Sequence, residues 1–163
     1  DAYRLFCDSQ NSVTENQAIV DNPDQISKTI NEIKKIIFMD IHEVSEDLEE
    51  FEFSIFKIIV NFDSLSLMIF DNFIENEKID YLIVIKLLSF LGRINHPNTY
   101  HQRTILLQKS LRNSSRYVRE GARLGLLYLR NLSVIPSLKE AIEVETSERL
   151  KKKLIYTVKT LGS

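Results

Sequence analysis

Apolar residues spaced four, four and three positions apart occur four times along this chain of 163 residues. That spacing places the side chains of each set on one face of an α-helix. The sets are Phe51, Ile55, Ile59 and Phe62; Ile79, Ile83, Leu87 and Phe90; Val118, Ala122, Leu126 and Leu129; and Leu150, Leu154, Val158 and Leu161. Because the chain has only 4 Gly and 3 Pro, turns between strands are scarce, and the pattern predicts an all-α fold.

Signals for helix starts and ends divide the chain into eight predicted helices. Asp24 and Ser45 are expected caps, Gly92 an expected stop, and Pro136 fits a first turn. The expected helices cover residues 24–39, 45–62, 64 or 66 to 74, 77–92, 99–111, 115–130, 132–145 and 147–161. Short breaks join them into about four antiparallel hairpins, which predicts an α-solenoid. We expect residues 1–23 to be a loop or loosely ordered lead-in and 24–163 to be a single helical-repeat domain.

One stretch carries a resemblance to a known family. "YVREGARLGLLYL" followed by "NLSVIPSLKEAI" resembles a HEAT-type repeat, especially the short bacterial variety of phycobilisome-lyase-like proteins. The matching residues are Val118, Arg119, Ala122, Gly125, Leu126, Ile135, Pro136 and Leu138. The resemblance is best over 99–161. The first two hairpins lack the Val-Arg pair and the alanine, so we interpret them as degenerate repeats, with an unrelated helical cap as the alternative. It implies a HEAT/armadillo-like solenoid used as a binding surface, with no catalytic residues to transfer.

Charge is unevenly divided along the chain. Residues 1–80 carry 18 acidic and 6 basic side chains, net −12, whereas residues 81–163 carry 5 and 15, net +10. On a helical wheel, Arg116, Arg119, Arg123 and Arg130 fall within a narrow arc, and most of the remaining circumference is apolar or small. We interpret these arginines as a water-exposed strip on the inner helices. With Tyr81 and Lys86 nearby, the strip is the predicted partner-binding surface.

A structural interpretation of the same arginines stays open. In the register of the repeats, Arg116 aligns with Glu77 and Glu148, and Arg119 aligns with Asp80. Neighbouring repeats would then form a ladder of ion pairs that neutralises part of the strip. Arg123 and Arg130 align with no acid, so they are the stronger candidates for contact with a partner. Replacing both with Glu is expected to leave stability nearly unchanged and to abolish partner capture.

Catalytic and metal-binding patterns are absent from the sequence. Cys7 is the only cysteine, which excludes an intrachain disulfide and agrees with a reducing, cytoplasmic location. His42, His96 and His101 do not have the spacing of a metal-ligand set, and no glycine-rich phosphate loop occurs. The apolar run 53–70 is broken by Lys57, Asn61 and Asp63, so we expect no membrane span. We therefore expect no enzyme activity, metal or cofactor.

The function predicted is a non-enzymatic protein–protein interaction module or scaffold. The alternative is a nucleic-acid-binding repeat protein, acting through the basic second half, although the acidic first half would repel a long duplex. A further alternative, implied by the resemblance, is a bilin lyase or chaperone-like helper. The opposite charges of the two halves also suggest electrostatic self-association between copies of the chain.

Overall fold

The computed structural model describes residues 23–39, 47–76 and 78–163, so the expected lead-in and the expected cap Ser45 lie outside the described residues. Within these ranges the protein is all-helical, with no strand. The helices are α3 (Pro23–Ile37), α5 (Leu48–Asn76), α6 (Tyr81–Arg93), α7 (Tyr100–Ser110), α8 (Arg116–Leu129), α9 (Ile135–Val144) and α10 (Glu148–Leu161). Two 3₁₀ turns, η2 (Pro97–Thr99) and η3 (Leu132–Val134), precede α7 and α9.

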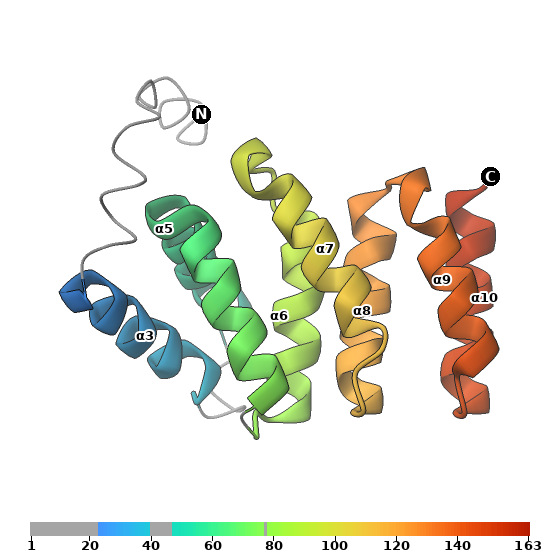
Figure 1. Ribbon diagram of the computed structural model, residues 1–163, viewed down its shortest axis with the longest axis horizontal. Coiled ribbons are helices and arrows are strands. Elements are labelled where there is room, and N and C mark those ends of the chain that lie inside the picture. Colours follow the sequence, from blue (N-terminus) through green and yellow to red (C-terminus); the bar gives the residue numbers. More distant parts are fainter. Residues whose placement is uncertain (1–22, 40–46, 77) are drawn as a thin grey trace.

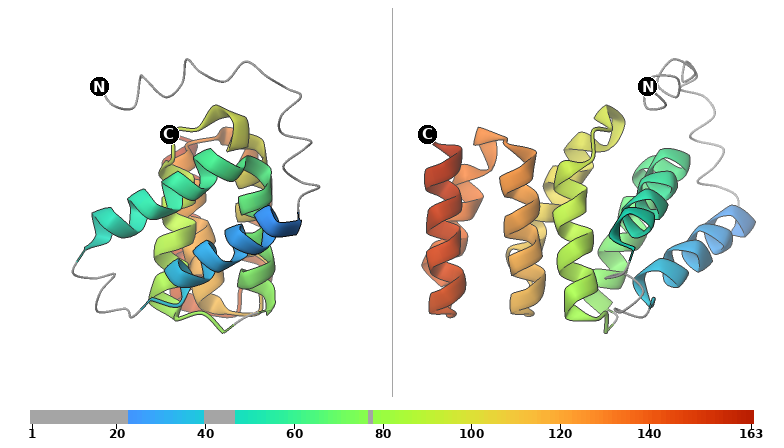
Figure 2. Two further views of the ribbon diagram at one scale, coloured as in Figure 1. Left: turned by 90° about the vertical axis from the view of Figure 1, so that its left-hand side faces the viewer. Right: turned by 180° about the vertical axis from the view of Figure 1, so that it is seen from behind.

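The helices follow one another along the long axis of the molecule in two layers (Figure 1). One layer contains α6, α8 and α10, which face the viewer when the molecule is seen from behind (Figure 2). The other contains the second half of α5, then α7 and α9, while α3 packs against α5 at the N-terminal end. The buried apolar side chains form one continuous cluster from Ile33 to Leu154, so each helix obtains its core from its neighbours.

The predicted break between helix 45–62 and the helix from 64 or 66 to 74 is present in the structure as a kink within α5. Helix α5 runs through both, and its one non-helical residue is Asp63, with φ 39° and ψ −122°. Only glycine adopts such a positive φ without steric strain. The Ser66 hydroxyl donates a hydrogen bond to the Asp63 carbonyl at 2.6 Å, which ties the second segment to the break. The break redirects the chain as the expected loop would have done.

The boundaries of α8 and α10 agree closely with the sequence expectations. Ser115 precedes α8, and Ser147 caps α10 by accepting a hydrogen bond from the Leu150 amide. Helix α6 differs from its expectation. It begins after Asp80, whose carboxylate accepts from the Leu82 amide at 2.8 Å, so Ile79 precedes the helix.

Gly92 was predicted to end a helix and instead lies inside α6, which continues to Arg93. A Cβ atom at Gly92 would lie 1.9 Å from the Gly125 carbonyl oxygen of α8. At Gly125 it would lie 2.5 Å from the Leu88 carbonyl oxygen, and at Gly121 3.0 Å from the Ile85 Cα. The three glycines let the backbones of α6 and α8 approach more closely than side chains would allow. We call this contact between α6 and α8, which meet at Gly92, Gly121 and Gly125, the α6–α8 seam. It sets the geometry of the candidate site.

Candidate functional site

Three side chains at the starts of α6 and α8 form an exposed cluster. The ring centroids of Tyr81 and Tyr117 lie 4.7 Å apart, with planes inclined by 35°. The Arg116 guanidinium lies 4.7 Å from the centroid of the Tyr117 ring, and its Nη2 donates a hydrogen bond to the Tyr117 hydroxyl at 2.8 Å. Tyr81 remains 46% exposed. These residues, the tyrosine–arginine cluster, present aromatic and cationic groups that hold one another in place.

A hollow of about 500 Å³ lies at the other ends of the same two helices. The Arg93 guanidinium is 5.6 Å from the centroid of the Tyr128 ring and forms an ion pair with Glu52 of α5. Tyr128 is 46% exposed, which leaves its ring accessible from solvent. We call the feature the Tyr128 hollow; it is lined by Gly92, Arg93, Ile94, Asn95, His96, Pro97, Tyr100, Arg103, Tyr128 and Leu129.

The cluster and the hollow lie along one stripe of α8. Tyr117 and Tyr128 are eleven positions apart, which places them on the same side of the helix and about 16 Å from each other. The tight seam between α6 and α8 brings Tyr81 to Tyr117 at one end and Arg93 to Tyr128 at the other. The seam therefore carries an aromatic ring with an arginine at each end.

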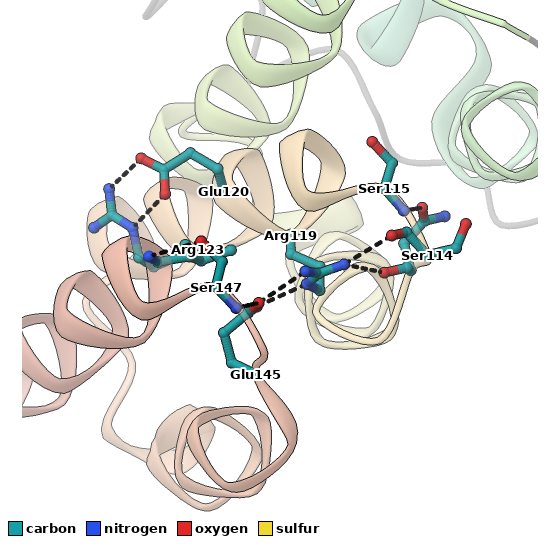
Figure 3. A network of polar contacts seen from close by, with 9 residues as sticks. Ser114, Ser115, Arg119, Glu120, Arg123, Glu145 and Ser147 are labelled. Atoms are coloured by element: carbon teal, nitrogen blue, oxygen red, sulfur yellow. Dashed lines mark hydrogen bonds and ion pairs between the residues drawn. The ribbon is translucent and has the colours of Figure 1, made fainter.

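The structure contradicts the expectation that Arg119 and Arg123 lie on an exposed strip. Arg123 is only 6% exposed. Its Nη1 donates to the Thr157 hydroxyl of α10 at 3.0 Å, and its Nε and Nη2 donate to the Glu120 carboxylate at 3.3 and 3.1 Å (Figure 3). The reason is that α10 packs over this side of α8, so the side chain is covered by the next helix.

Like Arg123, Arg119 connects α8 to the C-terminal pair of helices through polar contacts, and we call these two sets of contacts the polar tethers. Its Nε and Nη2 donate to the two Glu145 carboxylate oxygens at 2.7 and 2.8 Å, and its Nη1 donates to the carbonyls of Asn113 and Ser114 at 2.9 Å each (Figure 3). The predicted pair between Arg119 and Asp80 is not formed, since Asp80 caps α6. Every donor nitrogen of this guanidinium is engaged within the protein.

The acids in these tethers have perturbed pKa values. Hydrogen bonds from Arg119 hold the pKa of Glu145 below its ordinary value of 4.5. For Glu120, burial favours the neutral form, but hydrogen bonds from Arg123 and Lys153 outweigh burial and lower the pKa. The same contact with Glu145 raises the pKa of Arg119. Both carboxylates are thus held ionised as structural partners.

The other predicted site residues have different surroundings. Arg116 is exposed and belongs to the tyrosine–arginine cluster. No ion pair joins it to Glu148, and its other predicted partner, Glu77, lies outside the described residues. Arg130 ends α8 in the left-handed conformation, with φ 52° and ψ 36°, and is exposed. Lys86 is half-buried on α6, about 140° around the helix from Tyr81. Of the six predicted residues, the structure brings only Tyr81 and Arg116 together in one cluster.

Sequence reasoning missed several side chains that shape this surface. Tyr117, Tyr128 and Arg93 were not among the candidates, although Tyr117, Gly121, Leu124 and Tyr128 share one stripe of α8 by spacing alone. Arg103 was also missed, because a buried arginine has no sequence signature. It is 1% exposed and donates to the carbonyls of Leu91 and His96, which fixes the loop beneath the Tyr128 hollow.

His96 lies in a polar junction beneath this surface. Its Nε2 is 3.7 Å from Asp63 Oδ1, and its Nδ1 is 3.1 Å from the Thr99 hydroxyl. Burial lowers the pKa of His96 and raises that of Asp63. Thr99 is fully buried, so its hydroxyl is out of reach of a substrate. Within residues 23–39, 47–76 and 78–163, no three His, Cys, Asp or Glu side chains are grouped to hold a metal.

Helix α5 alone among the described helices is long and apolar enough, on length and composition, to cross a membrane. The expectation that no run spans a membrane stays a prediction. In the structure, 44% of its most apolar window is buried against the rest of the protein. It packs against α3, α6 and α7, and a core helix with such contacts satisfies the same criteria.

Comparisons of the chain with known protein families, with characterised proteins and with solved structures found no match.

Proposed function

We propose that this chain is a HEAT-like α-solenoid that works as a non-enzymatic protein-binding module. The sequential order of the helices along the long axis and their division into two layers support the solenoid (Figure 1). The core residues of the four repeated apolar sets also support it, since each set contributes to one continuous cluster. The resemblance of residues 115–142 to a HEAT-type repeat agrees with this architecture.

The tyrosine–arginine cluster is the observation that carries the proposal for binding. Tyrosine and arginine are the residue types most enriched among energetically dominant interface contacts. Here they lie together and already stacked in the free protein, with Tyr81 and Arg116 exposed and Tyr117 half-buried between them. A partner that covers them loses little side-chain entropy, because the geometry exists before binding. The contact surface proposed is therefore the α6–α8 seam, in place of the arginine strip.

The test compares proteins captured from an extract of the cells that make this protein. The variant carries Tyr81→Ser and Arg116→Glu, and its matched control carries Tyr156→Ser and Lys139→Glu, exposed positions on α10 and α9. We expect the control to retain the proteins captured by the wild type and the seam variant to lose them. Circular dichroism should show that both variants stay folded. Equal capture by all three would refute the seam as the binding surface.

Nucleic-acid binding stays the alternative, and the ion pairs of the described residues weigh against it. Six of the 15 basic side chains in residues 81–163 form ion pairs within the described residues. The pairs are Arg93–Glu52, Lys109–Asp71, Lys109–Glu75, Arg112–Glu140, Arg119–Glu145, Arg123–Glu120 and Lys153–Glu120. A gel shift across salt concentrations decides the matter, since polyanion binding weakens steeply as salt rises. A shifted complex that forms at low salt and dissociates as the salt concentration rises would favour nucleic-acid binding.

A further inference from the structure

The charges beside the α6–α8 seam are unevenly matched. Two acids of the neighbouring helices are in ion pairs: Glu52 with Arg93, and Glu120 with Arg123 and Lys153. Arg116 is in no ion pair with the described residues, although it hydrogen-bonds Tyr117. A guanidinium that stacks on one ring keeps donors for a carboxylate. The Asp80 carboxylate beside Tyr81 is in no ion pair among the described residues, but it accepts the Leu82 amide as the cap of α6. Arg116 is therefore the cation of the seam that is available to a carboxylate ligand.

The two ends of the seam differ in depth. The tyrosine–arginine cluster is an open surface, whereas the Tyr128 hollow has a volume of about 500 Å³ and apolar walls from Ile94, Pro97 and Leu129. Hollows of this size accept one or a few apolar side chains. Between the ends, α6 and α8 are too close for anything to insert, because their backbones meet at Gly92 and Gly125. A ligand must lie over the seam and anchor at its ends.

We propose that the α6–α8 seam binds an acidic, extended segment of a partner protein, with an aromatic or aliphatic side chain in the Tyr128 hollow and a carboxylate at Arg116. The spacing supports an extended segment, because Tyr117 and Tyr128 are about 16 Å apart and a strand covers that span with about five residues. The inference rests on the proposed function and adds the chemical class of the partner.

A polypeptide fits the seam better than a nucleic acid. A phosphodiester strand carries one charge per nucleotide and requires a continuous cationic track. Along this seam, one end has Arg116 and the other has Arg93, which Glu52 already neutralises. A peptide, unlike a phosphodiester strand, can carry an acidic side chain only at the position that faces a cation of the protein. The apolar walls of the hollow contribute to binding only if the ligand carries an apolar side chain.

The test uses fluorescence anisotropy with three labelled probes and the whole chain. The probes are a glutamate-rich copolymer of glutamate and tyrosine, polyglutamate of similar length, and a single-stranded oligothymidylate of matched charge. We expect the copolymer to bind more tightly than polyglutamate. Arg116→Glu and Tyr128→Ser should each weaken its binding about tenfold. The matched controls Lys139→Glu and Tyr156→Ser should leave binding unchanged.

Four results would overturn the inference. These are no copolymer binding at low salt, equal binding of polyglutamate, equal binding of the oligothymidylate with the same dependence on Arg116, or equal weakening by Lys139→Glu. The outcome is separable from that of the proposed function. If the copolymer fails to bind while capture from extracts still depends on Tyr81 and Arg116, the seam remains a binding surface for a partner of other chemistry.

Discussion

Arg119 of α8 and Glu145, in the turn between α9 and α10, form an ion pair with two parallel hydrogen bonds of 2.7 and 2.8 Å. The Glu145 side chain is 1% exposed, and its Oε1 also accepts from the Ser147 amide at 2.9 Å. The Glu145 carboxylate thus connects α8 to the last pair of helices and accepts a backbone hydrogen bond at the start of α10. Paired geometry of this kind is stronger than a single charged hydrogen bond.

Glu145→Gln is expected to lower the free energy of unfolding by about 2 kcal/mol or more. A glutamine keeps the shape and one acceptor oxygen, but it leaves a half-buried guanidinium without its counter-charge. Urea unfolding followed by circular dichroism measures the change. Glu143→Gln, an exposed neighbour on α9, should leave the urea midpoint nearly unchanged. A similar loss in both variants would mean that the pair contributes nothing specific.

The same pair should make stability fall in acid. Hydrogen bonds from Arg119 place the pKa of folded Glu145 below its ordinary 4.5. The folded state therefore binds fewer protons than the unfolded state just below that pH, and stability is lost as pH falls from 4.5 through the lower folded value. Glu120 acts with the same sign. Urea midpoints measured from neutral pH to pH of about 3 should decline less steeply in Glu145→Gln than in the wild type.

Gly92→Ala is expected to destabilise the protein strongly, by about 3 kcal/mol or more. Its methyl group would lie 1.9 Å from the Gly125 carbonyl oxygen, and a backbone atom cannot move aside without separating α6 from α8. Gly162→Ala is the matched control, because its nearest contact would be 3.3 Å. Thermal unfolding should give a lower Tm for Gly92→Ala only. Equal Tm values would show that the helices are not held so closely.

Asp63→Gly is expected to stabilise the protein by about 1 kcal/mol or more. Glycine adopts the φ of 39° without strain. The change also removes a carboxylate whose Oδ1 is buried without a hydrogen bond and whose pKa is raised by burial. Asn61→Gly, at an exposed helical position, should instead destabilise, since glycine is a poor helix former. A fall in the urea midpoint for Asp63→Gly would mean that the contact with His96 outweighs the strain.

Much of the fold could be predicted because helix ends depend on local chemistry. Ser147 caps α10 through its side chain, Ser115 precedes α8 without a side-chain cap, and Pro136 lies in the first turn of α9 as expected. Gly92 was misassigned because glycine serves two purposes, a flexible stop and a point of close approach, and the sequence does not distinguish them. The break at Asp63 within α5 falls where the sequence predicted one helix to end and the next to begin.

The site could be predicted only in part, because exposure depends on the neighbouring helix. The wheel grouped Arg119 with Arg123, but it could not reveal that Arg123 bonds Thr157 of α10 and that Arg119 pairs with Glu145 in the turn before α10. It grouped Tyr117 with Tyr128 as apolar, although both contribute to an exposed seam. That seam arises from three glycines on two helices. The contact between the two helices is part of the tertiary structure, so the sequence pattern of either helix alone does not show it.

Arg123 and Arg130 were predicted to tolerate Glu equally, and the structure now separates them. At position 123, Glu would place a second carboxylate beside Glu120 and leave Thr157 without its donor. Breaking such a buried charged pair costs about 3 kcal/mol or more. Arg130 is exposed at the end of α8, so Arg130→Glu should change the urea midpoint little. Arg130→Gly should raise the free energy of unfolding by about 1 kcal/mol, because φ is 52°. If Arg123→Glu proves as stable as the wild type, Arg123 cannot occupy a buried tether between α8 and α10.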